Sequence, residues 1–314
     1  MAATQFIGLD LGGTKCALGV ETTDGSFREV ARFPTRGPDE TLARFAGEIG
    51  RLPPAAVRAI GVSCGGPLDA KRGVILSPPN LPGWDEVWVC RWLDEKFGGN
   101  SRLMNDANAC ALAEWQQGAG RGVQSLMFLT MGTGMGAGLI LDGRLYEGIS
   151  GNAGEVGHVR LAADGPVGFG KAGSFEGFCS GGGIAQLARR RVAEFSGRSA
   201  LSELSAETLS ARDIGVAAEA GDTLALALWH DVGERLGQAI AAFIDVLNPE
   251  RIVIGGIYPR CEKFIAPAMR AVIAREALPP SVRDCAVVPA ALGEEIGSRA
   301  AVAIARYHFS SSTL

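Results

Sequence analysis

The sequence predicts an α/β protein built from two related halves. Apolar runs of strand length alternate with segments of helical periodicity along most of the 314 residues. One arrangement, a strand, a glycine turn, a second strand and a hairpin, occurs twice, with Gly12 and Gly132 in matching positions. Two such halves flanking a cleft would place both glycine turns at that cleft.

The composition indicates a packed globular protein. Hydrophobic residues make up 47% of the chain and charged residues 20%, which allows a large core and disfavours disorder. A net charge of -4 without a basic run argues against a nucleic-acid partner. The sequence shows neither a signal peptide at its start nor an apolar segment of membrane-spanning length. The seven cysteines include no C-x-x-C pair, so we expect reduced core residues in a cytoplasmic protein.

In the first half, strands and helices alternate as expected for a sheet covered by helices. The predicted strands are 5–11, 16–20, 27–33, 58–63 and 101–104, and the predicted helices are 38–52, 85–97 and 107–114. Thr23, Asp24 and Gly25 form a hairpin signal between two of the strands. Pro38 opens the first helix, whose apolar residues are spaced to share one face.

The second half repeats this order. Its predicted strands are 125–131, 138–141 and 251–254, and its predicted helices are 183–194, 222–247 and 293–307. Asn248 and Pro249 end the long helix, because the residue before a proline disfavours the helical conformation. We expect residues 1–106 to form a smaller N-terminal domain on which the C-terminal helix 294–309 packs. Residues 107–293 would form the larger domain.

One carboxylate, Asp106, lies at a predicted strand-to-helix junction. Asn105 and Asp106 close an apolar run, and helix-forming residues follow at once. Backbone N–H groups point outward at such a junction, so a ligand can approach it. A carboxylate between two glycine turns indicates phosphoryl transfer to a hydroxyl. The alternative is that Asp106 only caps its helix.

The two glycine turns are candidate phosphate sites. Residues 10–15 read D-L-G-G-T-K, and their glycines allow the backbone to approach a phosphate closely. Asp10 could hold Mg²⁺ through water, because Mg²⁺ favours one or two carboxylates together with phosphates. An ordinary hairpin is the alternative. The second turn, G-T-G-M-G-A-G from Gly132, is not followed by a helical pattern, which disfavours a dinucleotide-binding fold.

A third glycine-rich segment is a false match to a phosphate-binding motif. Residues 165–172 read G-P-V-G-F-G-K-A, close to the P-loop pattern G-x-x-x-x-G-K-[ST]. The residue after Lys171 is Ala172, so the hydroxyl that would bind Mg²⁺ is missing, and no buried strand precedes the segment. We therefore predict a loop here.

Three polar residues in glycine-rich surroundings are candidate sugar ligands. Glu155, His158 and Glu176 can accept and donate hydrogen bonds to a ring of hydroxyls. The alternative is that the two glutamates are solvated loop charges. A Ser-His-Asp hydrolase is disfavoured, because the sequence contains no G-x-S-x-G elbow.

Taken together, these motifs resemble the ROK family (repressor, open reading frame, kinase). The motifs that occur in the family's order are D-L-G-G-T-K, G-G-P-L-D, P-N-L-P-G-W, N-D-A-N-A, G-T-G-M-G-A-G, A-G-E-V-G-H, S-G-G-G and I-V-I-G-G. The resemblance covers nearly the whole chain. It implies an actin-like, hexokinase-type (ribonuclease H-like) fold and phosphorylation of hexoses or N-acetylhexosamines with ATP and Mg²⁺.

The resemblance also implies roles for individual residues. Asp106 would be the catalytic base, next to the primary hydroxyl of the sugar. The residues that would contact the sugar are Gly66, Asn80, Asn105, Asp106, Glu155, His158 and Glu176. Those that would hold ATP phosphates and Mg²⁺ are Asp10, Gly12, Gly13, Thr14, Lys15, Gly132, Thr133 and Gly134, with Gly255 and Gly256 near the nucleoside.

One segment departs from the family pattern. Many members carry C-x-C-G-x-x-G-C-x-E after the G-H pair, and with the histidine it binds a structural zinc. Here Val167, Phe169 and Ser174 stand where the cysteines would be. His158 and Cys179 are too few ligands for a closed tetrahedral site. We therefore expect no zinc, and we expect Phe169 and Val167 to pack the loop instead.

Three functions remain open, and an ATP-dependent hexose kinase acting on glucose is the one we favour. The second is a kinase for N-acetylmannosamine, N-acetylglucosamine or fructose. The third is a catalytically silent sugar-binding or regulatory protein. The first strand begins by about Gln5, which leaves no room for the helix-turn-helix domain of ROK repressors. Family likeness implies a homodimer, and polyphosphate in place of ATP stays open.

Overall fold

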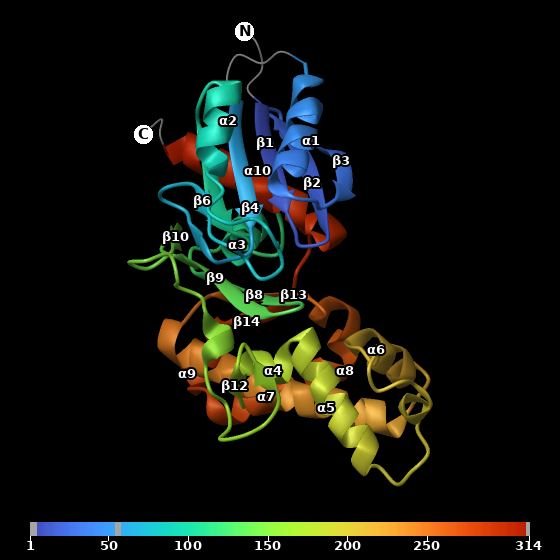
Figure 1. Cartoon of the computed structure of the whole chain (residues 1–314). Helices are drawn as coiled ribbons and strands as arrows, with labels where there is room; N and C mark the ends of the chain where they lie inside the picture. The colour runs from blue at the N-terminus through green and yellow to red at the C-terminus, as the bar shows by residue number, and fades with distance from the viewer. Residues whose placement is uncertain (1–4, 54–57, 312–314) are drawn as a thin grey trace. The chain divides into compact units, whose positions relative to one another are not determined.

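The computed structural model describes residues 5–53 and 58–311, which fall into two compact units (Figure 1). The first unit comprises residues 1–121, 145–153 and 292–314, and the second comprises 122–144 and 154–291. This division differs from the expected boundary at residue 106, because helix α3 (Asp106–Gln117) packs against α10 (Ile296–Ser311) in the first unit. The expectation that the chain starts without a signal peptide concerns residues that include 1–4. These four residues lie outside the described part.

The first unit is built on a five-stranded sheet with the order β3-β2-β1-β4-β7. These strands are β1 (Gln5–Leu11), β2 (Lys15–Thr22), β3 (Phe27–Pro34), β4 (Arg58–Cys64) and β7 (Ser101–Asn105). Strands β1, β2 and β3 are antiparallel neighbours, whereas β4 and β7 run parallel to β1. Because parallel strands end at the same edge of a sheet, the residues after β1, β4 and β7 lie together.

Helices cover both faces of this sheet, and the alternation of side chains along β1 explains why. Ile7 and Leu9 pack in the core with Phe45 of α1 (Pro38–Gly50) and with residues of α2 (Val89–Phe97). Gly8 faces the opposite side, where a Cβ atom would lie only 2.3 Å from the backbone nitrogen of Val302 in α10. The glycine thus lets α10 lie directly on the sheet, on the face opposite α1 and α2 (Figure 1).

Helix α2 begins four residues later than the sequence predicted. The expected start was Asp85, but Glu86 has a φ of +52° and Val87 bridges to Ile75. This segment therefore pairs with the short hairpin of β5 (Leu68–Asp69) and β6 (Val74–Ile75) before the helix starts at Val89.

The second unit repeats the sheet order of the first. Its sheet has the order β10-β9-β8-β13-β14, with antiparallel β8–β9 and parallel β8–β13–β14, which matches the predicted repeat. The strands are β8 (Leu126–Met131), β9 (Met135–Leu141), β13 (Arg251–Gly256) and β14 (Ala286–Pro289), and the edge strand β10 (Arg144–Tyr146) begins in this unit but has its last two residues in the first. The helices are α4 (Phe175–Cys179), α5 (Gly181–Glu194), α6 (Ala211–Glu219), α7 (Thr223–Leu247), α8 (Tyr258–Glu276) and α9 (Pro279–Asp284).

Helix α8 was not predicted from the sequence, although it packs extensively against α7. Gly233 and Gly237 of α7 allow this close approach, because a Cβ on either would lie within 2.7 Å of a carbonyl oxygen of α8. Pro267 within α8 interrupts the helical pattern at the sequence level. In the part of the chain that the structure describes, no helix is long and apolar enough to cross a bilayer.

Candidate active site

Three chain reversals meet at one edge of the first sheet. Leu11 pairs with Cys64, and Cys64 pairs with Asn105. The residues that follow these three are therefore neighbours: the D-L-G-G-T-K turn, the Gly65–Gly66 turn and Asp106. The structure thus brings together the residues of the first unit that the sequence singled out for phosphate and sugar.

Asp106 is the first residue of α3, and the helix cap is supplied by its neighbour. The Asn105 side chain caps α3 by accepting a hydrogen bond from Ala107 N at 2.9 Å. Asp106 Oδ1 also accepts from Ala107 N, at 2.8 Å, while its side chain remains open to solvent. Desolvation by the surrounding protein raises the pKa of Asp106, and the backbone hydrogen bond from Ala107 lowers it. Because the side chain is in contact with water, the rise in pKa caused by desolvation is reduced.

Asp10 lies near Asp106 in a partly buried position at the end of β1. Burial raises the pKa of Asp10 to about 6, with a further contribution from the charge of Asp106 and an opposing one from Arg32. Gly297 lies so close that a Cβ there would be 2.3 Å from Asp10 Oδ2. Two neighbouring carboxylates with raised pKa values form a site that a divalent cation would stabilise.

The turn after Asp10 is held by contacts from two loops. Thr35 Oγ1 donates to the carbonyl oxygen of Gly12 at 2.5 Å. A Cβ on Gly13 would lie 2.6 Å from the carbonyl oxygen of Asn80, so this residue of the P-N-L-P-G-W motif stands against the turn. Thr14 and Lys15 are exposed beyond it. Gly66 lies beside the Asn105 amide, 3.9 Å from Nδ2 to the position of a Cβ.

In the second unit, the glycine turn at residues 132–134 lies against the start of α5. Gly132 N donates to the carbonyl oxygen of Gly134 at 3.0 Å, and Gly181 N donates to that of Gly132 at 2.8 Å. Gly256, with a φ of +75°, lies against Met131 at the end of β8. Gly181 had no role in the sequence prediction, although the S-G-G-G run that begins the helix was a visible signal. The start of α5 therefore fixes the position of the glycine turn.

Glu176 is connected to the same turn. Its Oε2 accepts a hydrogen bond from Met135 N at 3.0 Å, and a Cβ on Gly134 would lie 2.9 Å from that oxygen. Gly157, in the 3-10 helix Val156–His158, lies against both Met135 and Glu176. The turn, Glu176 and the segment that carries Glu155 and His158 therefore form one cluster in the second unit.

By contrast, Gly255 does not face this cluster. It is buried within β13, where a Cβ would lie 2.9 Å from the ring of Phe128. Four residues of the second unit that were predicted to bind sugar or ATP are exposed: Thr133, Glu155, His158 and Gly256.

The segment predicted as a loop, residues 165–172, is a short hairpin of β11 (Val167–Gly168) and β12 (Lys171–Ala172). Gln186 holds it by two hydrogen bonds to the backbone of Val167, at 3.0 and 2.9 Å. Lys171 Nζ donates to the carbonyl oxygen of His158 at 2.7 Å. The Phe169 ring stands edge-on to the His158 imidazole with centroids 5.2 Å apart. The hairpin therefore supports His158.

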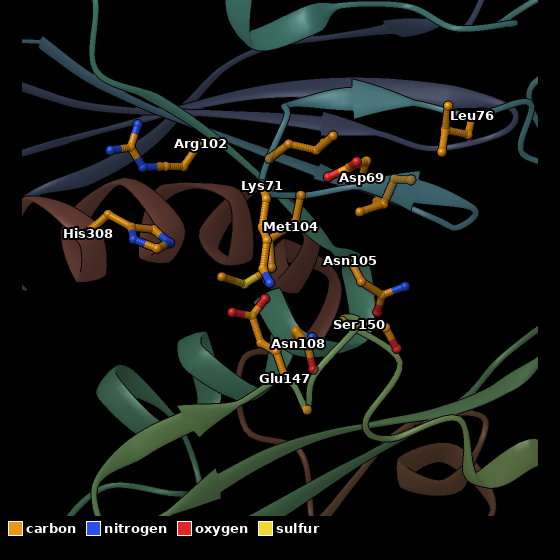
Figure 2. Close-up of a pocket in the computed structure, with 15 residues that line it drawn as sticks. Asp69, Lys71, Leu76, Arg102, Met104, Asn105, Asn108, Glu147, Ser150 and His308 are labelled. Carbon is orange, nitrogen blue, oxygen red and sulfur yellow. The ribbon is translucent and has the colours of Figure 1, made fainter.

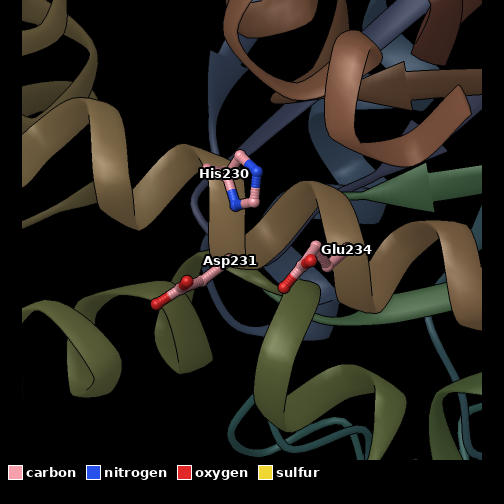
Figure 3. A group of neighbouring side chains, drawn as sticks. All are labelled: His230, Asp231 and Glu234. Carbon is pink, nitrogen blue, oxygen red and sulfur yellow. The ribbon is translucent and has the colours of Figure 1, made fainter. Parts of the chain in front are cut away.

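The donor atoms near His158 do not fit a tetrahedral zinc. Cys179, the last residue of α4, is buried, and its Sγ lies 3.9 Å from the carbonyl oxygen of Val232. Within the described ranges, the group that could hold a metal is elsewhere, at His230, Asp231 and Glu234 on α7 (Figure 3). Asp231 there already forms an ion pair with Arg191. These residues lie on a helix surface and take no part in the cluster around Glu176.

Comparison with known proteins identifies similar chains over almost the full length. The ROK family model matches residues 6–308. The glucokinase of Thermotoga maritima is 31% identical over 311 residues, which cover 97% of this chain and 98% of the relative. The N-acetylmannosamine kinase of Citrobacter koseri is 30% identical, covering 96% of this chain and 98% of the relative.

A solved structure gives the same result. The ROK family glucokinase of Streptomyces griseus, in complex with glucose and AMPPNP, is similar to this chain with a TM-score of 0.77 and 29% identity. The similarity covers 96% of this chain and 99% of that structure. The relatives identified by sequence and the structure identified by fold are all sugar kinases.

Proposed function

This chain belongs to the ROK family and is an ATP-dependent hexose kinase of the hexokinase type, and from that premise we propose that it phosphorylates the primary hydroxyl of glucose. The observation that carries the proposal is the edge of the first sheet, where Asp106 and the turn after Asp10 lie together. Similarity to glucokinases from two organisms supports glucose as the acceptor. N-acetylmannosamine, N-acetylglucosamine and fructose are the alternatives.

We assign the role of base to Asp106. The transition state of phosphoryl transfer is loose, so the hydroxyl proton can leave late and the carboxylate need not be strongly basic. Its raised pKa favours acceptance of that proton. Asn105, by capping the helix, fixes the direction of the Asp106 backbone and leaves its carboxylate at the open edge.

We assign ATP to the two glycine turns. Gly12, Gly13, Thr14 and Lys15 in the first unit, and Gly132, Thr133 and Gly134 in the second, would hold the phosphates, with Gly256 and the buried Gly255 near the nucleoside. Gly181, whose N–H donates to the carbonyl oxygen of Gly132, would hold this turn in place from the start of α5. Asp10 would hold Mg²⁺ through water, and that ion would supply charge neutralisation for the phosphates.

We assign the sugar hydroxyls to the residues Gly66, Asn80, Asn105, Glu155, His158 and Glu176. Carboxylate oxygens accept hydrogen bonds from hydroxyls, and the imidazole and amide groups can both donate and accept. These residue types can bind the hydroxyls of several hexoses, so the test below compares acceptors. We also expect a homodimer, which light scattering of the purified protein would test.

The test is release of ADP, measured with a coupled assay across a panel of acceptors. The panel contains glucose, fructose, N-acetylglucosamine and N-acetylmannosamine, with polyphosphate replacing ATP in a second series. We expect the highest kcat/KM for glucose with ATP. A higher value for an N-acetylhexosamine or fructose would replace the proposed acceptor. Sugar binding without any ADP release would instead indicate a sugar-binding protein.

A further inference from the structure

The first unit contains a pocket of about 780 Å³ that the proposed reaction does not use. Its walls are formed by β7 and the start of α3, by the β5–β6 hairpin, by residues 147–151 and by the end of α10 (Figure 2). Of the proposed site residues, Asn105 alone lines it. The volume lies in the range of small-molecule sites, which are clefts of roughly 300–1,000 Å³.

Two cations of this pocket form no ion pair with the residues that the structure describes. In residues 5–53 and 58–311, no carboxylate oxygen lies within 4.0 Å of Lys71 or Arg102, whereas neighbouring Arg91 pairs with Glu95 at 2.8 Å. Lys71 Nζ lies 3.5 Å from the carbonyl oxygen of Ile149, and Arg102 donates to that of Ser101. Both cations also line a second pocket of about 360 Å³. An anionic group of a ligand would satisfy them.

Two further residues of the pocket offer hydrogen-bond acceptors. Asn108 is buried, with 2% of its surface exposed, and its Oδ1 has no hydrogen-bond partner within the described part of the chain. A buried, unpaired carbonyl costs stability, and a donor from a ligand would remove that cost. Glu147 faces Lys71 (Figure 2), and burial raises the pKa of its carboxyl group. Hydroxyl groups are donors that both residues could use.

We propose that this pocket binds a phosphorylated sugar, with its phosphate at Lys71 and Arg102 and its hydroxyls at Asn108 and Glu147. Inorganic phosphate alone would leave most of the volume and both acceptors unused. Apolar side chains, such as Leu76 and Met104, would pack against the sugar ring.

The position of the pocket connects it to the reaction. Met104 and Asn105 line it, and Asp106 follows them directly at the start of α3. The product of a hexose kinase belongs to the same chemical class as the proposed ligand, so the pocket would sense product. This role rests on the proposed function, whereas the binding itself does not.

The experiment is a calorimetric titration of glucose 6-phosphate into protein saturated with glucose and a non-hydrolysable ATP analogue. We expect binding at one site per chain with the substrate sites filled. Arg102→Gln and Lys71→Met should each raise Kd at least about 10-fold, which corresponds to about 1.4 kcal/mol. Arg91→Gln is the matched control, since Arg91 lines only the second pocket and is paired; it should leave Kd unchanged.

Three results would overturn the proposal: loss of binding when the substrate sites are filled, an unchanged Kd in both test variants, or equal affinity for inorganic phosphate. Lys71, Arg102 and Arg91 are exposed, so their substitution should leave the fold intact. If the protein released no ADP with any acceptor, the proposed kinase function would be contradicted. The proposal that the pocket binds a phosphorylated sugar would still stand. The titration needs no turnover, so the two failures are distinguishable.

Discussion

Burial is the largest cause of the raised pKa values of two carboxylates of the first unit, Asp106 and Asp10. Asp106 is affected chiefly by desolvation, whereas Asp10 combines burial with the nearby charge of Asp106. The sequence predicted that Asp106 follows a strand, but it left open whether this residue only caps its helix. In the structure Asn105 caps the helix and shares Ala107 N with Asp106 Oδ1, while the Asp106 side chain stays open to solvent for the chemistry that we propose.

We predict that Asp106→Asn lowers kcat by roughly 10²- to 10⁴-fold, the usual contribution of a general base. Sugar binding should remain measurable by calorimetry, because the amide keeps the size and hydrogen-bonding capacity of the side chain. Asp39→Asn is the control, since Asp39 also lies in the first turn of a helix, α1, and has no proposed role. Near-normal turnover of Asp106→Asn would remove this residue from the role of base.

We predict that Asp10→Asn stabilises the ligand-free protein while lowering its activity. The pKa of Asp10 is about 6 in the folded state against an ordinary value of 3.8, so its ionisation opposes folding. The destabilisation caused by ionised Asp10 is absent below pH ~4. It grows between pH 4 and pH 6 and reaches its full value above pH ~6. The substitution should therefore raise the free energy of unfolding at pH 8 by up to about 3 kcal/mol.

Denaturant unfolding of both proteins at pH 8 and pH 5 measures this effect. The gain should be smaller at pH 5, where Asp10 of the folded wild type is largely protonated. A gain that is equal at the two pH values, or a loss of stability at pH 8, would contradict this account of Asp10.

At the scale of elements, the β11–β12 hairpin shows how a segment without metal ligands can support a binding residue. Lys171 binds the backbone of His158, Phe169 contacts its ring, and Gln186 holds the hairpin itself. Phe169 is 75% exposed and has a φ of +45°, so it is not part of the core. The expectation that Phe169 and Val167 pack this loop is therefore wrong, because both side chains are exposed, and Phe169 contacts His158 instead.

We predict that Phe169→Ala raises KM for the sugar about 2- to 10-fold with a smaller change in kcat, since an aromatic pair contributes about 0.5–1.5 kcal/mol. Phe169→Tyr should restore the wild-type KM, because it keeps the ring. Val246→Ala, at a residue of the same unit that is 80% exposed, is the control for loss of a surface side chain. An equal fall in kcat and KM, or no change, would show that the ring does not position His158.

At the scale of the whole molecule, the two sheets share one strand order, and this repeat was predictable from the sequence. Buried strands appear as apolar runs, and glycine turns between them mark the reversals, so both signals are local. Helix α8 and strand β14 were not predicted. The buried residues of α8 are specified by α7, which is distant in sequence, and β14 has only four residues.

We predict that the purified protein contains no stoichiometric zinc and that a chelator leaves its thermal unfolding midpoint unchanged. The reason is the lack of a closed ligand set around His158, where Val167, Phe169 and Ser174 provide no thiolate. Elemental analysis together with thermal unfolding before and after chelation gives the measurement. One zinc per chain, with a lower midpoint after its removal, would overturn this prediction.

The sequence by itself determined the α/β class, the repeat of two sheets, and Asp106 with the two glycine turns as candidate site residues, because motifs of a few residues encode local backbone geometry. The tertiary structure alone decided which of these residues are neighbours, through strand register and close glycine contacts such as Gly8 on α10. It alone shows the support of His158 by the hairpin and the pocket beside Asn105. Both features arise from packing between segments that are distant in sequence, and local sequence patterns do not predict such packing.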